Sequence, residues 1–363
     1  MKSILVSAIL SAFVSAFALN SIIIANDSSI TESRSYTDPI WSKDGNFIAF
    51  ITIKGNKSNL IVVSADGSKG EVLFSADKDI LVNPDWSPDS TKLAFIYQKV
   101  QDFGDLKIIT QSNIYIVNRD GSELFNVTGS NPELVDRVNT RQQWSPDGNQ
   151  LSFSSERENS DTWIVNFKDM SFKNLTSNSN AISAYSSWSP DGKSLAYIAY
   201  DKTEIYIHSL ISESTTTLEL PKTPSYLAWS PNGASILIQP FEGNMFLLSV
   251  ADGLTHELNL DGTKPLWSPD GAEILVEALP GISLDDINSL SNWDIMKFNI
   301  QENKLLNLTT TNTSKDISAS WSPDGTQIVF ISDRDGFENI WIMNSDGTGQ
   351  HILTGDLLID NAI

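Results

Sequence analysis

The sequence contains no cysteine among its 363 residues. This absence excludes disulfide bonds, thiolate metal sites, a cysteine nucleophile and a lipid attached to cysteine. Histidine is nearly as scarce, with three residues in the whole chain. Because they are so few, a catalytic or metal site built on a histidine cluster is not expected.

Positive charge is also in short supply. The chain has 24 Lys and Arg against 45 Asp and Glu, which gives a formal net charge of −21. Nucleic acid and anionic membrane surfaces are both bound through clusters of Lys and Arg, so neither is an expected partner. The hydrophobic fraction of 40% is that of a globular protein rather than a disordered one.

Long hydrophobic runs are missing beyond the N-terminus, so the mature chain is expected to have no membrane span. Residues 1–18 predict a secretory signal peptide, with Lys2 as its positive end and Ala16-Phe17-Ala18 as its cleavage site. An uncleaved anchor is the alternative, because the segment from Ser21 to Ala25 prolongs the apolar character. Cleavage after about Ala18 predicts a periplasmic or secreted protein.

What the sequence does contain is a repeated pentapeptide, Trp-Ser-Pro-Asp-Gly. Its seven copies begin at residues spaced by 45, 58, 44, 41, 38 and 54 positions, a spacing typical of propeller blades. The seven anchors are Trp41, Trp86, Trp144, Trp188, Trp229, Trp267 and Trp321.

The pentapeptide predicts a tight turn that follows a strand. Pro pre-sets φ at the first corner, and Gly accepts the positive φ that closes the turn. Three copies depart from the pattern, since Lys43 replaces Pro, Ser90 replaces Gly and Asn232 replaces Asp. All three replacements suit a turn, although Ser90 must adopt a positive φ that is unfavourable for a residue with a side chain.

Each copy begins a unit of four predicted strands. In the last unit these are Ser318 to Ser322, Gln327 to Ser332, Asn339 to Met343 and His351 to Thr354. Short strands, Asp-Gly turns and the lack of a long amphipathic helix predict an all-β, seven-bladed β-propeller of four-stranded antiparallel blades. Ring closure stays open: each unit forms a whole blade, or Ile22-Ile23-Ile24 adds a strand to the last one.

The chain is expected to divide into four segments. They are a signal peptide over 1–18, an irregular leader over 19–35, the propeller over 36–354 and a C-terminal tail over 355–363.

Four recurring patterns together resemble the TolB-like propeller repeat: the Trp-Ser-Pro-Asp-Gly box, Leu195-Ala196-Tyr197, Ile205-Tyr206-Ile207 and Asn174-Leu175-Thr176. The resemblance covers about residues 36–354. It implies a propeller, and within this family TolB itself is a periplasmic scaffold with an α/β domain before six blades. This chain has seven motifs and no room for that domain. Related propellers accompany hydrolase domains, and no such domain is present here.

Catalytic motifs are missing from the chain. Gly-x-Ser-x-Gly, the Walker loop and His-Glu-x-x-His are all absent. His208, His256 and His351 fall on third and fourth strands of different units, away from the axis. An enzyme similar to oligogalacturonate lyase would require a central histidine metal cluster, so neither a metal nor a cofactor is expected. Asp333-Arg334-Asp335-Gly336 suggests a calcium loop but lacks the later ligands.

Topology predicts where a ligand would bind. The pentapeptide turns lie on one face of the disc, which we call the motif face; the loops from second to third strands lie on the opposite face, the ring face. Three long insertions belong to the ring face, at Gln98–Ser112, Gly129–Thr140 and Ala278–Asn292. Because loops that vary on a repeated scaffold commonly carry binding, a ligand is expected on the ring face.

The position three residues before each Trp varies between units, yet stays polar or aromatic. We call these positions the variable ring and expect them around the channel mouth: Asp38, Asn83, Arg141, Tyr185, Tyr226, Lys264 and Ser318. Arg141, Lys264 and the two Tyr suit a peptide or an acidic group, with Arg137 assisting from the neighbouring loop. A solvated channel lining without a ligand is the alternative.

The sequence thus favours a monomeric, exported, non-catalytic scaffold that binds a protein or peptide at the channel mouth, on the face opposite the pentapeptide turns. The alternative is an enzyme or a carbohydrate-binding protein with its site at the same mouth.

Overall fold

Strands account for nearly all regular structure in the computed structural model. The structure describes residues 24–25, 34–102, 106–135, 137–156, 160–177, 183–278, 293–310 and 314–354. Within these ranges the only helix is a single 3-10 turn, η1 (Thr128–Ser130). None of the described helices is long and apolar enough to cross a membrane. The predicted signal peptide and the C-terminal tail lie outside the described residues.

The strands follow the predicted four-strand units in chain order. The first three units contain β2 (Arg34–Trp41), β3 (Phe47–Lys54), β4 (Lys57–Ser64), β5 (Gly70–Asp77); β6 (Ile80–Trp86), β7 (Lys92–Asp102), β8 (Leu106–Asn118), β9 (Phe125–Asn126); and β10 (Val138–Trp144), β11 (Gln150–Glu156), β12 (Ser160–Asn166), β13 (Ser171–Asn174). The fourth and fifth contain β14 (Ser183–Trp188), β15 (Ser194–Ala199), β16 (Glu204–Ser209), β17 (Ser214–Glu219); and β18 (Pro224–Trp229), β19 (Ser235–Pro240), β20 (Phe246–Ser249), β21 (Thr255–Glu257). The last two contain β22 (Thr263–Trp267), β23 (Glu273–Ala278), β24 (Asp294–Asn299), β25 (Lys304–Asn307); and β26 (Asp316–Trp321), β27 (Gln327–Ser332), β28 (Asn339–Asn344), β29 (His351–Ile352).

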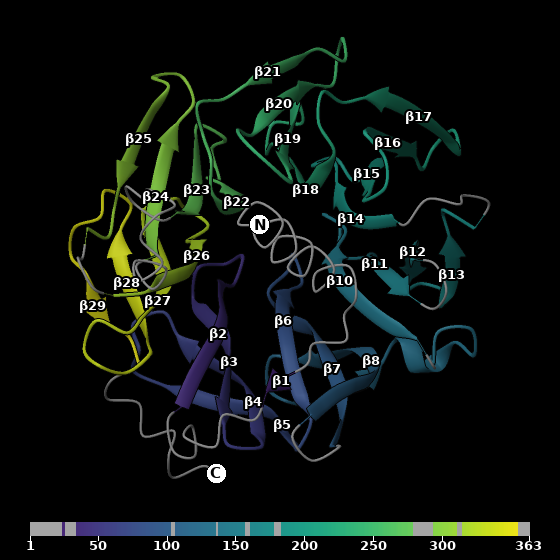
Figure 1. The fold of residues 1–363 in the computed structure, drawn as a ribbon. Helices are drawn as coiled ribbons and strands as arrows, with labels where there is room; N and C mark the ends of the chain where they lie inside the picture. Colours follow the sequence, from purple (N-terminus) through teal and green to yellow (C-terminus); the bar gives the residue numbers. More distant parts are fainter. Residues whose placement is uncertain are drawn as a thin grey trace, which may run out of the picture.

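The sheets confirm the all-β propeller. Five units form separate four-stranded antiparallel sheets, whereas the second and third share a nine-stranded sheet that also includes β1 (Ile24–Ala25). The two units meet at a single parallel pairing of Val138 with Ser112. Each keeps its own antiparallel order, and seven separate blades remain a prediction. Figure 1 shows the first strands, β2, β6, β10, β14, β18, β22 and β26, lying innermost around a central axis.

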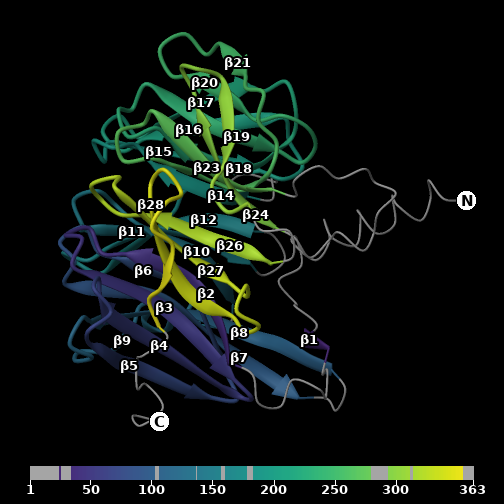
Figure 2. The same cartoon turned by 90° about the vertical axis from the view of Figure 1, so that its left-hand side faces the viewer.

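Two expectations about the chain between the units require correction. The segment Gln98–Ser112 is not a loop insertion: β7 and β8 run on through it, paired as far as Asp102 with Lys107. Figure 2 shows this hairpin extending beyond the other strands on the ring face. The leader is not irregular throughout, because Ile24–Ala25 pairs with β8 and β2 begins at Arg34. The described pair Ile24–Ala25 therefore joins the second unit rather than the last, and Ile22 and Ile23 lie outside the described residues.

The pentapeptide forms the predicted turn in every unit. In the last copy the Ser322 hydroxyl donates to Asp324 Oδ1 at 2.6 Å and accepts the N–H of Gln327, while Gly325 has a φ of 71°. Asn232 replaces Asp without loss, since its Oδ1 accepts from Ser230 and from the N–H of Ala234. The turn is thus held by its own side chains before any contact between units is made.

Successive turns pack on one another. The Pro of each copy covers the Gly of the next: a Cβ added at Gly148 would lie 3.5 Å from Cδ of Pro88, and Pro323 covers Gly45 in the same way, which closes the ring. The copy that has Lys43 in place of Pro and the copy that has Ser90 in place of Gly are neighbours in the ring. There the Ser90 hydroxyl accepts the N–H of Asp44 at 3.0 Å, which offsets the strain of its φ of 59°.

The anchor Trp side chains link neighbouring units. Trp188 donates its indole N–H to the backbone carbonyl of Gln143 at 3.2 Å, and Trp86, Trp144 and Trp267 make the equivalent bond to the preceding unit. Trp321 is as buried as Trp188, but its indole N–H has no partner among the described residues. The motif Trp is therefore a packing residue between blades, as the sequence predicts.

Buried apolar side chains fill the space between units. The first and last units share such a cluster, in which Trp41 and Phe50 pack with Val329 and Ile342. Their sheets exchange no strand within the described chain. The ring therefore closes by side-chain packing between whole units, the first of the two expected arrangements.

We predict that Trp188→Phe destabilises the fold by about 1 kcal/mol more than Trp321→Phe. Both substitutions remove the same apolar volume from similarly buried sites, and only the first breaks a hydrogen bond. Denaturant unfolding of the two variants measures this difference. Equal losses would contradict a role of the indole N–H in linking the units.

We also predict that stability falls in acid because of the turns. The Ser hydroxyl within each turn, with the backbone N–H groups, holds the pKa of Asp89, Asp191, Asp270 and Asp324 below its ordinary value. A lowered folded-state pKa stabilises the fold above the unfolded value of about 4, and this contribution disappears as the pH falls through the folded value.

Unfolding free energies measured from pH 6 down to pH 2 should show this loss below about pH 4. Asp324→Asn, which copies the natural Asn232, should fold and show a shallower acid dependence. An unchanged slope in this variant would contradict the assignment.

Candidate binding site

The innermost strands share an irregularity at the variable ring. In all seven, the pairing with the second strand shifts register near the ring position. Five ring residues have a left-handed backbone there: Asp38, Asn83, Arg141, Lys264 and Ser318, with φ between 50° and 56°. A β-bulge therefore recurs at this position and breaks the regular alternation of side chains.

The sequence contains a signal for this bulge. Asp38, Asn83 and Lys264 are each followed by a proline within the strand. Proline has no N–H to contribute to a sheet, so inside an inner strand it fits at a bulge. The variability of the ring position was visible in the sequence, whereas the reason for it, a strand that locally leaves the ladder, becomes clear only in the structure.

Neighbouring ring positions contact one another in the first three units. The backbone N–H of Asn83 donates to Asp38 Oδ2 at 3.2 Å. Gln142, which follows Arg141, donates its side-chain amide to the carbonyl oxygen of Asn83. Polar bonds thus connect the ring from the first unit to the third.

Arg141, Tyr185 and Tyr226 form a cluster. The guanidinium of Arg141 lies 4.4 Å from the ring centroid of Tyr185. Tyr185 meets Tyr226 edge-on, with centroids 5.2 Å apart. The structure therefore brings together three of the four ring residues that the sequence singles out for binding a peptide or an acidic group, whereas Lys264 lies apart from them.

Three further side chains belong to this cluster and were missed. Tyr200 lies 5.6 Å from the Arg141 guanidinium and 5.7 Å from Phe241, and Glu156 Oε1 lies 3.9 Å from Arg141 Nη1. Each occupies the same place in its unit, twelve residues after Trp144, Trp188 or Trp229. Counting forward from the anchors as well as backward would have found them.

Lys264 and Ser318 form a separate pair on the other side of the ring. Lys264 Nζ donates to the Ser318 hydroxyl at 3.2 Å and lies 3.2 Å from Glu277. Glu277 is buried and accepts the backbone N–H of Ser318 at 2.6 Å. Its carboxylate thereby fixes the bulge of β26 and holds Lys264 beside it.

Arg137 does not join the ring cluster in its described contacts. Its guanidinium lies 4.0 Å from Asp161 Oδ2 and 6.0 Å from the ring centroid of Trp163, both on β12. These contacts direct the Arg137 guanidinium toward β12, and its assistance in binding stays a prediction.

Burial changes the proton affinities in the cluster. Removal from water raises the pKa of Glu156, although the positive charge of Arg141 opposes the shift. Burial likewise raises the pKa of Tyr200 and Tyr226 well above the ordinary value for tyrosine. At neutral pH both tyrosines are protonated, so Arg141 is the permanent charge of the cluster.

The histidines lie where the sequence places them, on third and fourth strands. His208 is on β16, His256 on β21 and His351 on β29. Among the described residues, no group of three or more His, Cys, Asp or Glu is arranged to hold a metal ion. In the loop from Asp333 to Gly336, Arg334 instead bonds Asp316 at 2.9 Å.

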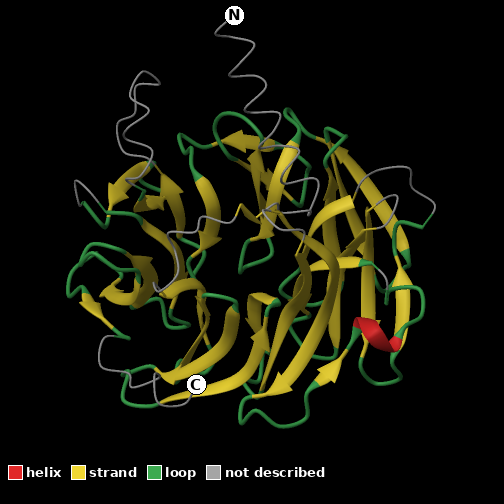
Figure 3. Cartoon of the chain, turned by 60° about the horizontal axis from the view of Figure 1, so that its bottom comes forward, coloured by secondary structure: helices red, strands yellow, loops and turns green. Residues whose placement is uncertain are grey.

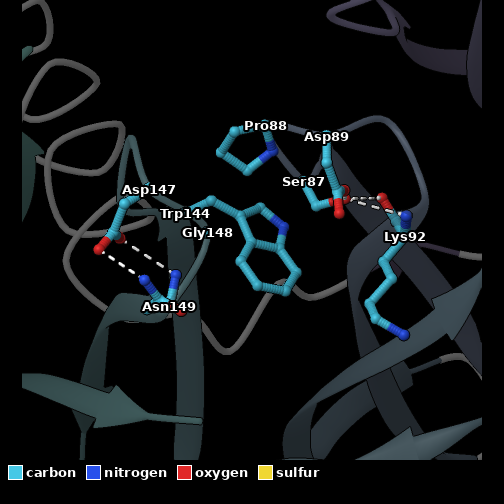
Figure 4. Close-up of a pocket in the computed structure, with 8 residues that line it drawn as sticks. All are labelled: Ser87, Pro88, Asp89, Lys92, Trp144, Asp147, Gly148 and Asn149. Carbon is cyan, nitrogen blue, oxygen red and sulfur yellow. Dashed lines mark hydrogen bonds between the residues drawn. The ribbon is translucent and has the colours of Figure 1, made fainter. Parts of the chain in front are cut away.

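A pocket of about 410 Å³ lies on the motif face rather than on the ring face. It is lined by the turns of the second and third units, and the indole of Trp144 lies between their polar residues (Figure 4). Asp147 accepts bonds from Asn149, and Lys92 Nζ donates to Asn118. Because its polar groups already serve the turns, the pocket is explained by the packing of the motif.

We predict that Ser318→Gly is more stable than Ser318→Ala by about 1 kcal/mol, because glycine adopts a positive φ without strain. Ser320, two residues later on β26 and without a positive φ, supplies the control. There glycine should be less stable than alanine. Denaturant unfolding of the four variants decides, and the same order at both positions would contradict a strained bulge.

Comparison with known proteins agrees with this architecture. A family model described as the TolB beta propeller domain matches residues 24–238. TolB from Acinetobacter baumannii superposes with a TM-score of 0.52 at 16% identity, covering 81% of this chain and 67% of that one.

Two further solved structures share the fold. An oligogalacturonate lyase in complex with manganese has a TM-score of 0.65 at 14% identity, covering 86% of this chain and 90% of that one. The β-propeller domain of the Trilobed protease from Pyrococcus furiosus, described as having an open velcro topology, has a TM-score of 0.54 at 16% identity and covers 76% and 82%. At these identities the likeness shows the fold alone.

Proposed function

Because the chain belongs to the TolB beta propeller domain family, we propose that it is an exported, non-catalytic scaffold that binds a protein or peptide partner through the variable ring. The partner contacts the ring face, opposite the pentapeptide turns. Arg141, Tyr185 and Tyr226 form the main contact, with Lys264 and Ser318 across the ring.

The contrast between the two faces carries this proposal. On the motif face every unit repeats the same turn, with the same Ser and Asp or Asn bonds. On the ring face the corresponding positions differ in charge, size and aromatic character from unit to unit. The units therefore pack alike but carry different side chains at the variable ring. Such differences allow the ring to recognise an asymmetric partner.

The chemistry of the cluster suits a peptide. Arg and Tyr dominate the binding energy of protein interfaces because they combine apolar area with fixed donors. The net charge of −21 argues against nucleic acid as the partner. The signal peptide predicted over residues 1–18 supports binding of the partner in the periplasm or outside the cell. We propose that the chain binds its partner as a monomer.

An enzyme or carbohydrate-binding protein with its site at the same mouth is the second candidate. It is favoured by the likeness in fold to the manganese-bound oligogalacturonate lyase. It is disfavoured by the separation of the three histidines on β16, β21 and β29. A panel of glycan-lyase and peptidase assays with and without divalent metal separates the two, since robust turnover would contradict the scaffold.

We predict that Arg141→Gln, Tyr226→Ala and Lys264→Gln combined reduce the amount of crosslinked partner at least tenfold, since hot-spot residues dominate interface energies. The measurement is crosslinking in cells, followed by quantitative identification of captured proteins. Arg119→Gln, Tyr206→Ala and Lys193→Gln combined form the control, because these residues lie away from the ring. Circular dichroism confirms folding. Retention of every partner by the ring variant would contradict the proposal.

A further inference from the structure

The seam between the third and fourth units is unlike the other junctions. Its buried apolar cluster consists of three residues, Ile164, Trp188 and Leu195. The clusters at the other six junctions, counted over the described chain, contain between eight and eleven buried residues each. Among the described residues, the seam therefore has a smaller buried apolar cluster than the other junctions, joined by the partly buried Leu175 and Leu210.

Polar side chains of the third unit occupy this seam. The register pairs Thr140 with Ser154 and Ser154 with Thr162, so these three side chains share one face of the sheet. Ser152 and Ile164 pair on the same face, and Ile164 packs on Trp188 of the fourth unit. The face with Thr140, Ser154 and Thr162 thus looks toward the fourth unit, and all three residues are buried.

Unpartnered polar atoms gather in this seam. Thr140 and Ser160 are each 5% exposed, and the hydroxyl of each has no hydrogen-bond partner among the described residues. Nη1 of Arg141 is also buried, and although it forms an ion pair with Glu156 it has no hydrogen-bond partner among the described residues. Buried polar groups in folded proteins nearly always have a partner, so a hydrogen-bond acceptor placed beside these groups would be stabilised there.

Arg141 lies where the seam meets the variable ring. Its side chain is 12% exposed, and its contacts join the two units: Glu156 of the third, Tyr185 and Tyr200 of the fourth. At 3.9 Å, the Glu156 carboxylate is too far from Nη1 for a hydrogen bond. The guanidinium is thus held in place with a donor left over.

The three unpartnered groups are all able to donate. A guanidinium donates only, and a hydroxyl donates to a stronger acceptor. Their natural complement is a group that only accepts, and a carboxylate has two such oxygens and pairs well with arginine. We propose that the seam between the third and fourth units is a slot for a carboxylate of the bound peptide, with Arg141 as its anchor and its chain neighbour Thr140 as a further donor.

This inference rests on the proposed function and identifies the chemistry that its site selects. The carboxylate comes from an acidic side chain or from the C-terminus of the peptide. A uronate sugar has the same group, and sugar rings are commonly bound by stacking on an open aromatic face. Here Arg141 already covers Tyr185, and Tyr226 meets the same ring edge-on at 70°. A peptide therefore fits the cluster of Arg141, Tyr185 and Tyr226 better than a sugar does.

The first experiment measures acetate and its neutral isostere acetamide against the full chain by saturation-transfer NMR. Acetate is expected to bind and acetamide is not. Arg141→Gln should abolish the acetate signal. Arg119→Gln is the matched control, because Arg119 also lies over an aromatic ring, 4.5 Å from Phe47, and beside a carboxylate, 3.7 Å from Asp44, but it is well exposed. Equal binding of acetate and acetamide would overturn the inference.

Thr140→Val tests the slot without threatening the fold. It replaces a buried, unpartnered hydroxyl by a methyl group of the same shape, so the free protein should melt no lower than the parent. Acetate affinity should fall about tenfold, because a hydrogen bond to a charged group is lost. A variant that melts lower and binds acetate unchanged would show that the hydroxyl serves the fold, which overturns its role as a donor.

Defined ligand pools identify the source of the carboxylate. One pool contains neutral peptides with free C-termini, a second contains amidated peptides with acidic side chains, a third contains neutral amidated peptides, and a fourth contains uronate oligosaccharides. Binding of the first or second pool that is lost in Arg141→Gln supports the inference and names the source.

Binding of the neutral amidated pool as strong as that of the acidic pools would overturn the slot while leaving the scaffold intact. Binding of the uronate pool alone would overturn the inference that the carboxylate belongs to a peptide. The scaffold proposal is tested separately, by whether the triple ring variant retains its partners, so the two failures are distinguishable.

Discussion

The structure depends on the contact between consecutive pentapeptide turns. Each turn is fixed internally by a Ser hydroxyl and an Asp carboxylate, and its Pro then covers the Gly of the next turn. The anchor Trp adds a bond from its indole to the preceding inner strand in several units. Because these contacts involve only the turn and the adjoining strand, they leave the opposite ends of the inner strands free to vary.

The departures from the motif support this view. Lys43 and Ser90 occur at the two positions that contact each other, so the loss of a Pro is matched by the loss of its Gly. A hydrogen bond from the backbone N–H of Asp44 to the Ser90 hydroxyl replaces the Pro–Gly contact there. Packing thus constrains neighbouring motif positions jointly and not one at a time.

Figure 3 shows the strands arranged around the ring, with the short helix η1 set at the outside.

Much of the fold follows from the sequence for this physical reason. Turn chemistry and period-two strands are local, so Gln327–Ser332 is predicted without error and neighbouring strands within a residue or two. Local signals do not reveal pairing between segments that vary: the β7–β8 extension looks like a polar insertion, and Ile24–Ala25 looks like part of a leader. Both depend on contacts between strands rather than on turn residues.

The candidate site is predictable in part. The variable ring is visible because it departs from a repeat, and Arg141, Tyr185 and Tyr226 do meet. The polar seam is not visible, because Ser and Thr in β11 and β12 resemble ordinary strand residues until the register places them on one face. The role of Arg137 stays a prediction, because its described contacts are to Asp161 and Trp163 rather than to Arg141.

Site-specific photocrosslinking tests the central idea, recognition on the ring face, most directly. A photoreactive residue is placed at position 226 in the variable ring, and in a second protein at position 193, an exposed position directly after the pentapeptide of the fourth unit. The structure predicts that partner crosslinks form in cells from position 226 and not from position 193. Crosslinks from position 193 alone would contradict it and place recognition on the motif face.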